Sequence, residues 1–559
     1  MNAEDKPWFG SWPKNVPKSI KTRIALHEVL ERTAKRYPEK VAIVSSNREL
    51  TFRDLNSSSG ALAVALAATG VRKRDRVAIL LPNVPQFVIA YFAILKIGAV
   101  VTTISPLLKE REIEYQLRDS EAATIVAIDS LYPTVQKVWS RTSLKRAIAT
   151  SLYDYVPHPN LFSNATEENL LVYSFDELLE KNAESRPPKI AINAEEDLAV
   201  LQYTGGTTGT AKGAMLTHSN LVSNALAFSA WIKSNAANET FLAALPLFHI
   251  YGMTTSMNVP INLAARIVLL HRFDPQTALE NIQQRRVTVF CGVPTMYSLL
   301  LANPNINRYD LTSIRVCISG ASPLPPHVQK KFMEISGGFL AEGYGLTEAS
   351  PVTHCTPVDR TMKRVKIGSI GLPLPDTDAR IVDLETGERT LETGLIGELS
   401  VKGPQVMKGY WKNPDETELV LRSEWLLTGD IGRMDEDGYF YITDRKKDLI
   451  KFKDYSVYPR EIEDVIYEHH AVKLCAVIGK PHPIWGEIPK AFIVLKDNKS
   501  ATESEIMEFV KDKLAPYKNV REIEFRKELP LSLAGKVLKR VLKEGESSSL
   551  VINTKSSAS

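Results

Sequence analysis

Cysteine is scarce in this chain of 559 residues, and the four cysteines are far apart. Cys291, Cys317, Cys355 and Cys475 form no C-x-x-C pair, so their spacing indicates neither a zinc knuckle nor a dithiol redox site. No histidine pattern typical of a metal site occurs either. Isolated cysteines are usually small buried hydrophobes in a reducing compartment, so we expect a cytoplasmic protein.

An excess of charge of one sign is also missing. The chain has 69 Lys and Arg against 65 Asp and Glu, a net charge of +4. This balance gives no reason to expect nucleic acid or an anionic membrane as a partner. A hydrophobic content of 44% and a charged content of 24% are typical of a globular protein. The length is too great for one ordinary core and predicts two or more domains.

Long hydrophobic runs are absent as well. The N-terminus, MNAEDKPWFGSWPKN, has no apolar segment of the kind that marks a secretory signal. The strongest candidate for a membrane span, residues 87–104, contains Lys96 and Gly98, and its second half is β-branched. We therefore expect a buried helix followed by a buried strand there, and no transmembrane segment.

What the first part of the chain does have is an alternation of helix and strand patterns. A helix is expected from Leu26, with Val29 and Leu30 on its apolar face, and a strand over residues 41–44. Similar pairs recur through residues 54–81 and 267–293. Alternation of this kind predicts an α/β fold in which helices cover β-sheets.

The pattern changes after Asp376 to short β segments separated by turns. A new helix is expected at Pro459, followed by strands, a helix from Glu503 and a last strand near Glu522. We predict a large N-terminal domain over residues 1–446, a small α+β C-terminal domain over residues 447–545, and a disordered tail over residues 546–559.

One glycine- and threonine-rich stretch, LQYTGGTTGTAKGAMLTH, begins at Leu201. It is not the P-loop of nucleotide hydrolases, because Ala211 precedes Lys212 and Gly213 follows it. It is a poor flexible linker, since a strand pattern stands on each side. Glycines allow backbone N–H groups to approach oxyanions, threonines add hydroxyl donors, and Lys212 adds a positive charge. The stretch predicts a phosphate-binding loop of another kind.

This loop resembles the signature of the adenylate-forming superfamily, which includes acyl-CoA synthetases, peptide-synthetase adenylation domains and beetle luciferases. Further motifs follow in the order of that superfamily over nearly the whole chain: PLFHIYGM, SGASPLP, GYGLTEASP, LTGDIG, DRKKDLIK and AGKVLKR. The resemblance implies a large domain of helix-covered sheets with a β-barrel-like part, and a small mobile C-terminal domain.

The resemblance also implies a reaction. A carboxylate attacks the α-phosphate of ATP, pyrophosphate leaves, and the acyl group passes to an acceptor thiol. Both reactants are anions, and two unit charges about 4 Å apart repel by about 4 kcal/mol at an effective dielectric constant near 20. Lys536 of AGKVLKR matches the lysine that bridges the α-phosphate and the carboxylate, so we assign it the main catalytic role.

The other nucleotide contacts are carried over from the same motifs. Glu348 is similar to the magnesium-associated glutamate, Thr347 to the α-phosphate-contacting threonine, and Thr207 is a second candidate beside Mg²⁺. Tyr344 is expected to lie against adenine. The remaining nucleotide-binding residues predicted in the large domain are Thr204, Gly205, Gly206, Thr208, Lys212, Gly320, Ala321, Ser322, Glu342 and Gly343.

Three predicted functions fall at or beyond the end of the large domain. Asp430 and Arg445 match ribose contacts, and a salt bridge between them is their alternative, compatible role. Lys447 falls at the hinge about which the small domain rotates between the two half-reactions. The loop of Lys451, Lys453, Asp454 and Ser456 is expected at the coenzyme A tunnel.

The carboxylic-acid pocket is assigned by position. His249 resembles the aromatic gate of the pocket, and Gly252 and Ala349 are expected to leave room for a bulky acid. The other predicted lining residues are Tyr251, Met253, Val293 and Cys355. Amino-acid-activating members have an aspartate where this chain has His249, just after Phe248, so an amino-acid substrate is disfavoured.

We therefore predict an AMP-forming ligase that joins a carboxylic acid, a medium- or long-chain fatty acid, to coenzyme A. Alternatives are an aryl acid ligase of the 4-coumarate type, an adenylating enzyme with another acceptor, and a non-catalytic nucleotide-binding protein. One departure is Asp454, where most members have glycine next to the pantetheine tunnel. Aspartate tolerates positive φ with some strain, so thioester formation is expected to be slower or differently tuned.

Overall fold

The chain folds into two compact units. The computed structural model describes residues 6–46, 48–152, 171–204, 211–234, 236–359, 361–453, 455–482, 484–531 and 537–546. The first unit consists of Met1–Asp378 and Val401–Leu426, and the second of Ala379–Ser400 and Leu427–Ser559. A large N-terminal and a smaller C-terminal part are thus confirmed. The hinge at Lys447 stays a prediction, and the predicted disordered tail lies, from residue 547 onward, outside the described residues.

A seven-stranded sheet in the first unit has the order β7-β6-β5-β3-β4-β8-β9. All its neighbours are parallel except β9, which pairs antiparallel with β8. Its apolar strands are buried because helices α4 and α5 pack on one face. The bounds are β3 Arg76–Leu80, β4 Val100–Thr103, β5 Thr124–Ile128, β6 Arg146–Thr150, β7 Leu171–Ser174, β8 Leu198–Thr204, β9 Lys212–Thr217, α4 Glu110–Ser120 and α5 Tyr132–Val138.

A nine-stranded sheet in the same unit has the order β16-β15-β14-β13-β12-β10-β11-β1-β2. The six strands from β14 to β1 are parallel, whereas β2, β15 and β16 pair antiparallel with their neighbours. The bounds are β1 Val41–Ser45, β2 Arg48–Thr51, β10 Thr240–Ala243, β11 Arg266–Leu269, β12 Val289–Gly292, β13 Val316–Ser319, β14 Phe339–Gly345, β15 Val352–Cys355 and β16 Leu372–Pro373.

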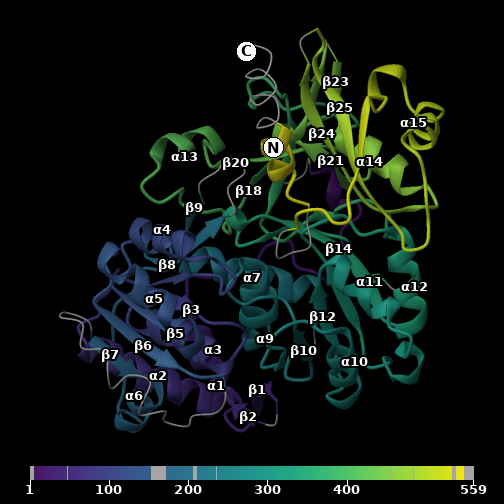
Figure 1. Ribbon diagram of the computed structural model, residues 1–559. Helices are drawn as coiled ribbons and strands as arrows, with labels where there is room; N and C mark the ends of the chain where they lie inside the picture. The colour runs from purple at the N-terminus through teal and green to yellow at the C-terminus, as the bar shows by residue number, and fades with distance from the viewer. Residues whose placement is uncertain are drawn as a thin grey trace, which may run out of the picture. The chain divides into compact units, whose positions relative to one another are not determined.

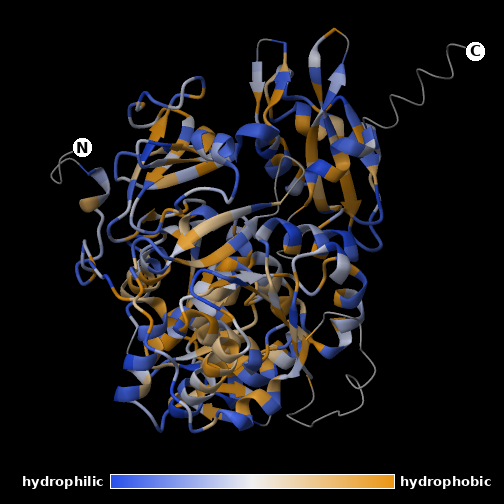
Figure 2. Cartoon of the chain, turned by 90° about the vertical axis from the view of Figure 1, so that its left-hand side faces the viewer, coloured by the Kyte–Doolittle hydropathy of each residue, from blue (hydrophilic) through white to orange (hydrophobic). Residues whose placement is uncertain are grey.

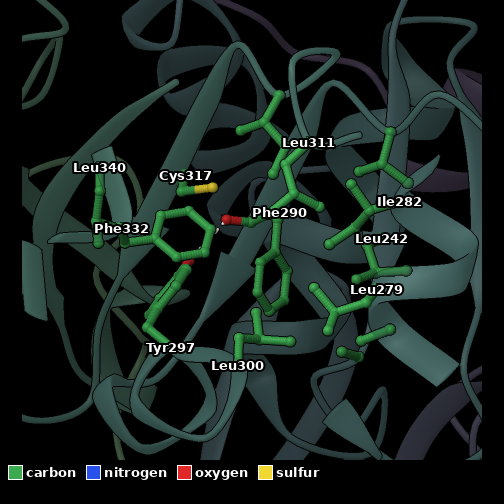
Figure 3. Close-up of a cluster of buried hydrophobic side chains, with 14 of the residues drawn as sticks. Leu242, Leu279, Ile282, Phe290, Tyr297, Leu300, Leu311, Cys317, Phe332 and Leu340 are labelled. Carbon is green, nitrogen blue, oxygen red and sulfur yellow. Dashed lines mark hydrogen bonds between the residues drawn. The ribbon is translucent and has the colours of Figure 1, made fainter. Parts of the chain in front are cut away.

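Three helices cover one side of this sheet: α10 Pro275–Gln284, α11 Pro294–Ala302 and α12 Pro326–Ser336 (Figure 1). Their apolar faces form a core with the strands, in which the Tyr297 ring meets the Phe332 ring edge-on at 5.1 Å (Figure 3). The Tyr297 hydroxyl donates to the Phe290 carbonyl at 2.9 Å. This buried hydroxyl is therefore satisfied, and the core fixes the strands that end at the site described below.

The other helices of the first unit include α3, in which every residue after Pro85 is buried. Its Lys96 donates to Glu31 at 2.7 Å and to Asn56 at 2.9 Å, which explains a lysine in an apolar helix. The predicted buried helix and strand over residues 87–104 are thus confirmed, as α3 and β4. The bounds are α1 Leu26–Arg36, α2 Phe52–Ala68, α3 Pro85–Lys96, α6 Phe175–Lys181, α7 His218–Trp231, α8 Ile250–Gly252, α9 Val259–Asn262, α13 Pro414–Val420 and the π-helix η4 Met253–Asn258.

No helix in the described ranges is both long enough and apolar enough to cross a bilayer. Several strands are largely hydrophobic, whereas many loops are hydrophilic (Figure 2). The described 3₁₀ helices are short: η1 Pro7–Phe9, η2 Asp129–Leu131, η3 Trp139–Arg141, η5 Ile306–Arg308, η6 Thr347–Ala349, η7 Lys446–Asp448 and η8 Pro516–Lys518.

Two five-stranded sheets complete the fold. The first has β17-β18-β20-β19 in order and β21 beside β20, and its barrel-like character stays a prediction. The second, with β23-β22-β25-β24 in order and β26 beside β25, packs against helices α14 and α15 and confirms the small α+β domain. The bounds are β17 Asp378–Val382, β18 Gly397–Lys402, β19 Leu421–Arg422, β20 Trp425–Met434, β21 Phe440–Arg445, β22 Ile450–Phe452, β23 Tyr455–Val457, β24 Val472–His482, β25 Gly486–Leu495, β26 Glu522–Phe525, α14 Pro459–Tyr467 and α15 Glu503–Lys511.

A buried histidine at the start of α7 makes the stability of the first unit dependent on pH. The His218 Nδ1 accepts from the Leu26 N–H at 3.1 Å, and burial lowers the pKa of His218 to about 3. The unfolded chain binds a proton near pH 6.5 that the folded chain does not, so stability falls as the pH drops below 6.5. Between pH 6.5 and pH 5 this loss amounts to about 2 kcal/mol.

We predict that His218→Asn weakens this pH dependence. Melting temperatures of the variant and the wild-type protein should converge as the pH is lowered from 7 to 5, since the variant has no imidazole to protonate. The matched control is His327→Asn, because His327 is exposed. If the melting temperature of His218→Asn, measured by thermal unfolding, depends on pH as steeply as that of the wild-type protein, His218 is not the cause of the pH dependence.

Candidate active site

The carboxyl ends of three parallel strands lie level with one another in the nine-stranded sheet. Gly292 at the end of β12 pairs with Ser319 at the end of β13, and Ser319 pairs with Glu342 in β14. The residues that follow, Val293, Gly320 and Gly343, are therefore brought to one edge. In open α/β sheets this edge is where ligands bind. The predicted adenine and acid-pocket residues Gly320, Ala321, Ser322, Glu342, Gly343, Tyr344 and Val293 are thus placed together.

Tyr251 of α8 packs directly against this edge. Its hydroxyl lies 3.0 Å from the Ile318 carbonyl and 3.3 Å from the Gly292 carbonyl, to which it can donate. A Cβ on Gly320 would lie 3.1 Å from the Tyr251 ring, so glycine lets the backbone come this close. Burial raises the pKa of Tyr251 well above its usual value. The Tyr251 side chain is therefore uncharged, and its hydroxyl is hydrogen-bonded to the ends of β12 and β13.

β14 continues beyond its parallel partner and pairs with β15 instead. Gly343 lies opposite Cys355, and Tyr344 lies opposite His354. The Tyr344 ring meets the His354 ring edge-on at 6.0 Å and is half-buried. Burial lowers the pKa of His354 to about 3, so this histidine is neutral. An aromatic face at a strand edge suits the predicted contact of Tyr344 with a nucleobase.

The segment around His249 is held by polar contacts from strands β4 and β8 of the seven-stranded sheet. The Phe248 carbonyl accepts from the Thr103 hydroxyl at 2.7 Å and from the Gln202 amide at 3.1 Å. The His249 Nδ1 accepts from the Tyr251 N–H at 3.2 Å and so caps α8. Desolvation by the surrounding protein lowers the pKa of His249. A neutral imidazole at this position fits the predicted gate.

The predicted lining of the acid pocket is uncharged. Met253, Ala349 and Cys355 have no exposed surface, and Val293 is 3% exposed. The prediction that Gly252 leaves room for a bulky acid is wrong, however. A Cβ there would lie 2.3 Å from the Pro246 carbonyl oxygen, so the free side of this glycine is filled by backbone and leaves no room for an acid.

Glu348 and Lys212 are connected through a residue that the sequence did not single out. The Tyr410 hydroxyl donates to the Glu348 carboxylate at 2.7 Å. The Lys212 ammonium lies 5.3 Å from the centre of the Tyr410 ring and forms an ion pair with Glu416. Lys212 itself is the register partner of Thr204, which places the two ends of the glycine-rich loop side by side. The strand patterns expected on each side of this loop are confirmed as β8 and β9.

Within the second unit, the two predicted ribose residues face each other. Asp430 and Arg445 are register partners in β20 and β21, and Arg445 Nε lies 2.8 Å from Asp430 Oδ1. Desolvation lowers the pKa of Lys447. Lys451 lies opposite Ser456 in the hairpin of β22 and β23, with 3.2 Å between Nζ and Oγ.

Six predicted site residues lie outside the described residues. They are Gly205, Gly206, Thr207, Thr208, Asp454 and Lys536. Their roles remain predictions that rest on the sequence motifs.

Comparison with known proteins identifies the family. The AMP-binding enzyme family matches residues 30–411, and its C-terminal domain matches residues 461–536. This chain belongs to the AMP-binding enzymes. The resemblance that the motifs indicated is confirmed.

Relatives of this AMP-binding enzyme align with it over nearly its full length. A long-chain-fatty-acid–CoA ligase of Bacillus subtilis is 44% identical over 557 residues, which is 97% of this chain and 98% of the relative. A feruloyl-CoA synthase of Amycolatopsis is 35% identical and covers 91% of this chain and 96% of its own. Among solved structures, an anthranilate CoA ligase in complex with anthranoyl-AMP superposes with a TM-score of 0.82 at 28% identity, covering 94% and 98% of the two chains.

The donor set of this AMP-binding enzyme fits Mg²⁺ that arrives with a nucleotide. No group of three or more His, Cys, Asp or Glu in the described ranges could cage a metal ion. Glu348 offers a carboxylate and Thr347 a hydroxyl, and both are half-buried on η6. Mg²⁺ commonly takes one or two carboxylates and completes its shell with phosphate oxygens and water. The residues present therefore fit the ion as a companion of ATP.

Proposed function

We propose that this protein is a long-chain fatty-acid–CoA ligase. It would join the fatty acid to the α-phosphate of ATP with release of pyrophosphate, and then transfer the acyl group to coenzyme A with release of AMP. The observation that carries the proposal is the similarity, over almost the whole chain, to a long-chain-fatty-acid–CoA ligase. The uncharged, buried lining of Tyr251, Met253, Val293, Ala349 and Cys355 supports an apolar acid.

In this proposal the charged residues overcome the repulsion between carboxylate and phosphate. Lys536 would bridge the two anions, and Lys212 with Thr204 and the glycine-rich loop would hold the departing phosphates. Glu348 and Thr347 would hold Mg²⁺, which when bound neutralises phosphate charge. Asp430 and Arg445 would accept and donate hydrogen bonds at the ribose. Water is kept from the acid by the apolar lining, so the carboxylate meets few competing donors.

The coenzyme A half-reaction is assigned to the second unit. Rotation at Lys447 would withdraw Lys536 and present the hairpin of Lys451, Lys453 and Ser456 to the acceptor. Asp454 remains the predicted point at which this step is tuned. Free coenzyme A, rather than a carrier protein, is the proposed acceptor. All four cysteines are buried and free, which agrees with the proposed cytoplasmic location.

The acid can be identified with a panel of carboxylates. Octanoate, dodecanoate, hexadecanoate, 4-coumarate, ferulate and anthranilate should be compared by AMP formation with and without coenzyme A. Each methylene that the pocket buries contributes about 0.8 kcal/mol, so kcat/KM is expected to rise about fourfold per added methylene over the buried length.

The same panel separates the alternatives. A higher kcat/KM for ferulate or 4-coumarate than for every fatty acid would replace the proposal with an aryl acid ligase. AMP release that does not depend on coenzyme A would indicate another acceptor. Absence of AMP with every acid would leave only the non-catalytic alternative.

A further inference from the structure

Tyr410 lies at the junction of three segments that the proposed function needs. Its backbone forms an antiparallel bridge with Ala214 of β9, the strand that leaves the glycine-rich loop. One residue on each side extends the pairing, since the Trp411 N–H donates to the Gly213 carbonyl at 2.8 Å and the Met215 N–H donates to the Gly409 carbonyl at 2.9 Å. The segment over residues 409–411 is thus an added strand along β9.

Residues just before this added strand also hold the backbone at and near the predicted magnesium residue, Glu348. The Met407 N–H donates to the Glu348 carbonyl at 2.8 Å, and the Ser350 hydroxyl donates to the Gln405 carbonyl at 2.9 Å. Glu348 is therefore held at its backbone by Met407 and at its carboxylate by Tyr410. The backbone contact sets where the residue lies, and the hydroxyl sets where its oxygen atoms point.

The Tyr410 side chain is well suited to orient a carboxylate. It is 8% exposed, and its backbone N–H donates to the Thr417 hydroxyl at 2.9 Å, so the ring is confined. The ordinary pKa of a tyrosine is about 10, so its hydroxyl is a proton donor at neutral pH. A protonated donor at 2.7 Å occupies one lone pair of one Glu348 oxygen and leaves the rest of the carboxylate for another ligand.

The ring itself faces a cation. Lys212 lies over it at 5.3 Å, so a single side chain contacts both the predicted phosphate lysine and the predicted magnesium carboxylate. Glu416, from α13, pairs with the same ammonium. Tyr410 thus contacts Lys212 with its ring and Glu348 with its hydroxyl.

We infer that Tyr410 is a positioning residue that aims the Glu348 carboxylate for metal–nucleotide binding. The inference rests on the proposed role of Glu348 and extends it to a residue that no motif of the sequence marks. Tyr410 acts through Glu348 and does not itself touch the substrates.

The test uses the full-length Tyr410→Phe variant, which keeps the ring and its contact with Lys212 and removes only the donor. Binding is measured by electron paramagnetic resonance, titrating Mn²⁺ into enzyme and the α,β-methylene analogue of ATP. Hydrogen bonds to charged groups contribute enough that we expect affinity for the Mn²⁺–nucleotide complex to fall about tenfold or more. Acid-dependent pyrophosphate exchange should fall by a similar factor.

Tyr441→Phe is the matched control. The Tyr441 hydroxyl also donates to a carboxylate, Asp435 at 3.1 Å, and its ring also faces a cation, Arg433 at 4.4 Å, in the second unit. A general loss of a tyrosine–carboxylate bond would lower the melting temperature in either variant. Only Tyr410→Phe should change Mn²⁺–nucleotide affinity.

A double-mutant cycle with Glu348→Gln distinguishes the inferred role of Tyr410 from the proposed role of Glu348. If Tyr410 acts through Glu348, the double variant binds no more weakly than Glu348→Gln alone. Weak binding in Glu348→Gln with wild-type affinity in Tyr410→Phe, or fully additive losses, would overturn the role of Tyr410 only. Wild-type affinity in Glu348→Gln would overturn the proposed role of Glu348 itself.

Discussion

Replacement of Lys536 by alanine is expected to lower acid-dependent exchange of pyrophosphate into ATP by about a hundredfold to a thousandfold. The lysine would be the one cation that lies between two anions as they react, and a truncated side chain leaves their repulsion uncompensated. ATP should still bind, because the threonines, Lys212 and the ribose contacts are untouched. Exchange is measured with labelled pyrophosphate, and nucleotide binding by equilibrium dialysis.

The two half-reactions make this prediction specific. A chemically prepared acyl-adenylate supplied with coenzyme A should give acyl-CoA at close to the wild-type rate, since Lys536 is assigned only to the first step. Lys527→Ala is the control, because Lys527 is an exposed lysine of the same unit. A wild-type rate of pyrophosphate exchange in Lys536→Ala would contradict the catalytic role proposed for Lys536.

The second large effect is expected from Gly252→Ala. Gly252 has helical torsions, φ −65° and ψ −42°, so an alanine there would suit the backbone. Its Cβ, however, would lie 2.3 Å from the Pro246 carbonyl oxygen and 2.8 Å from the carbonyl carbon. Backbone cannot move aside as a flexible side chain can. We expect a loss of about 3 kcal/mol and a melting temperature lower by about 5 °C or more.

This clash should also affect the acid pocket. The Pro246 carbonyl accepts from the His249 N–H at 3.2 Å, so displacing it shifts the turn that carries the predicted gate. Acid-dependent AMP formation should therefore fall at temperatures where the variant is still folded. Gly60→Ala in α2 is the control, because a Cβ there makes only an ordinary contact of 3.5 Å with Pro187. Equal melting temperatures for Gly252→Ala and the wild-type protein would contradict this account.

Most of the fold could be predicted from local patterns. Buried strands such as β5 and β12 are continuous apolar runs, and α1 shows its buried face in the spacing of Leu26, Val29 and Leu30. Those signals depend only on neighbours in sequence. The order of strands in the two large sheets depends on long-range pairing, and no local pattern specifies it.

Only part of the site could be predicted, because some of its residues are marked by short motifs and others depend on long-range pairing. Motifs marked Glu348, Lys212 and the strand ends at Gly320 and Gly343, because each is a short string of unusual composition. Tyr410 stands in MKGYWKNP, which shows no such composition, and its significance arises only when residues 409–411 pair with β9. Gly252 was marked, but its reason lies in the Pro246 carbonyl, which no spacing rule could place against it.

The pairing of residues 409–411 with β9 also bears on how this enzyme can be dissected. β9 is the terminal strand of its sheet, and a polypeptide that stopped before Val401 would leave its outer N–H and C=O groups without a protein partner. Bare strand edges of this kind recruit other strands, so such a fragment would tend to self-associate. The first unit is discontinuous, and isolating it intact requires Asp378 to be joined by a designed linker to Val401.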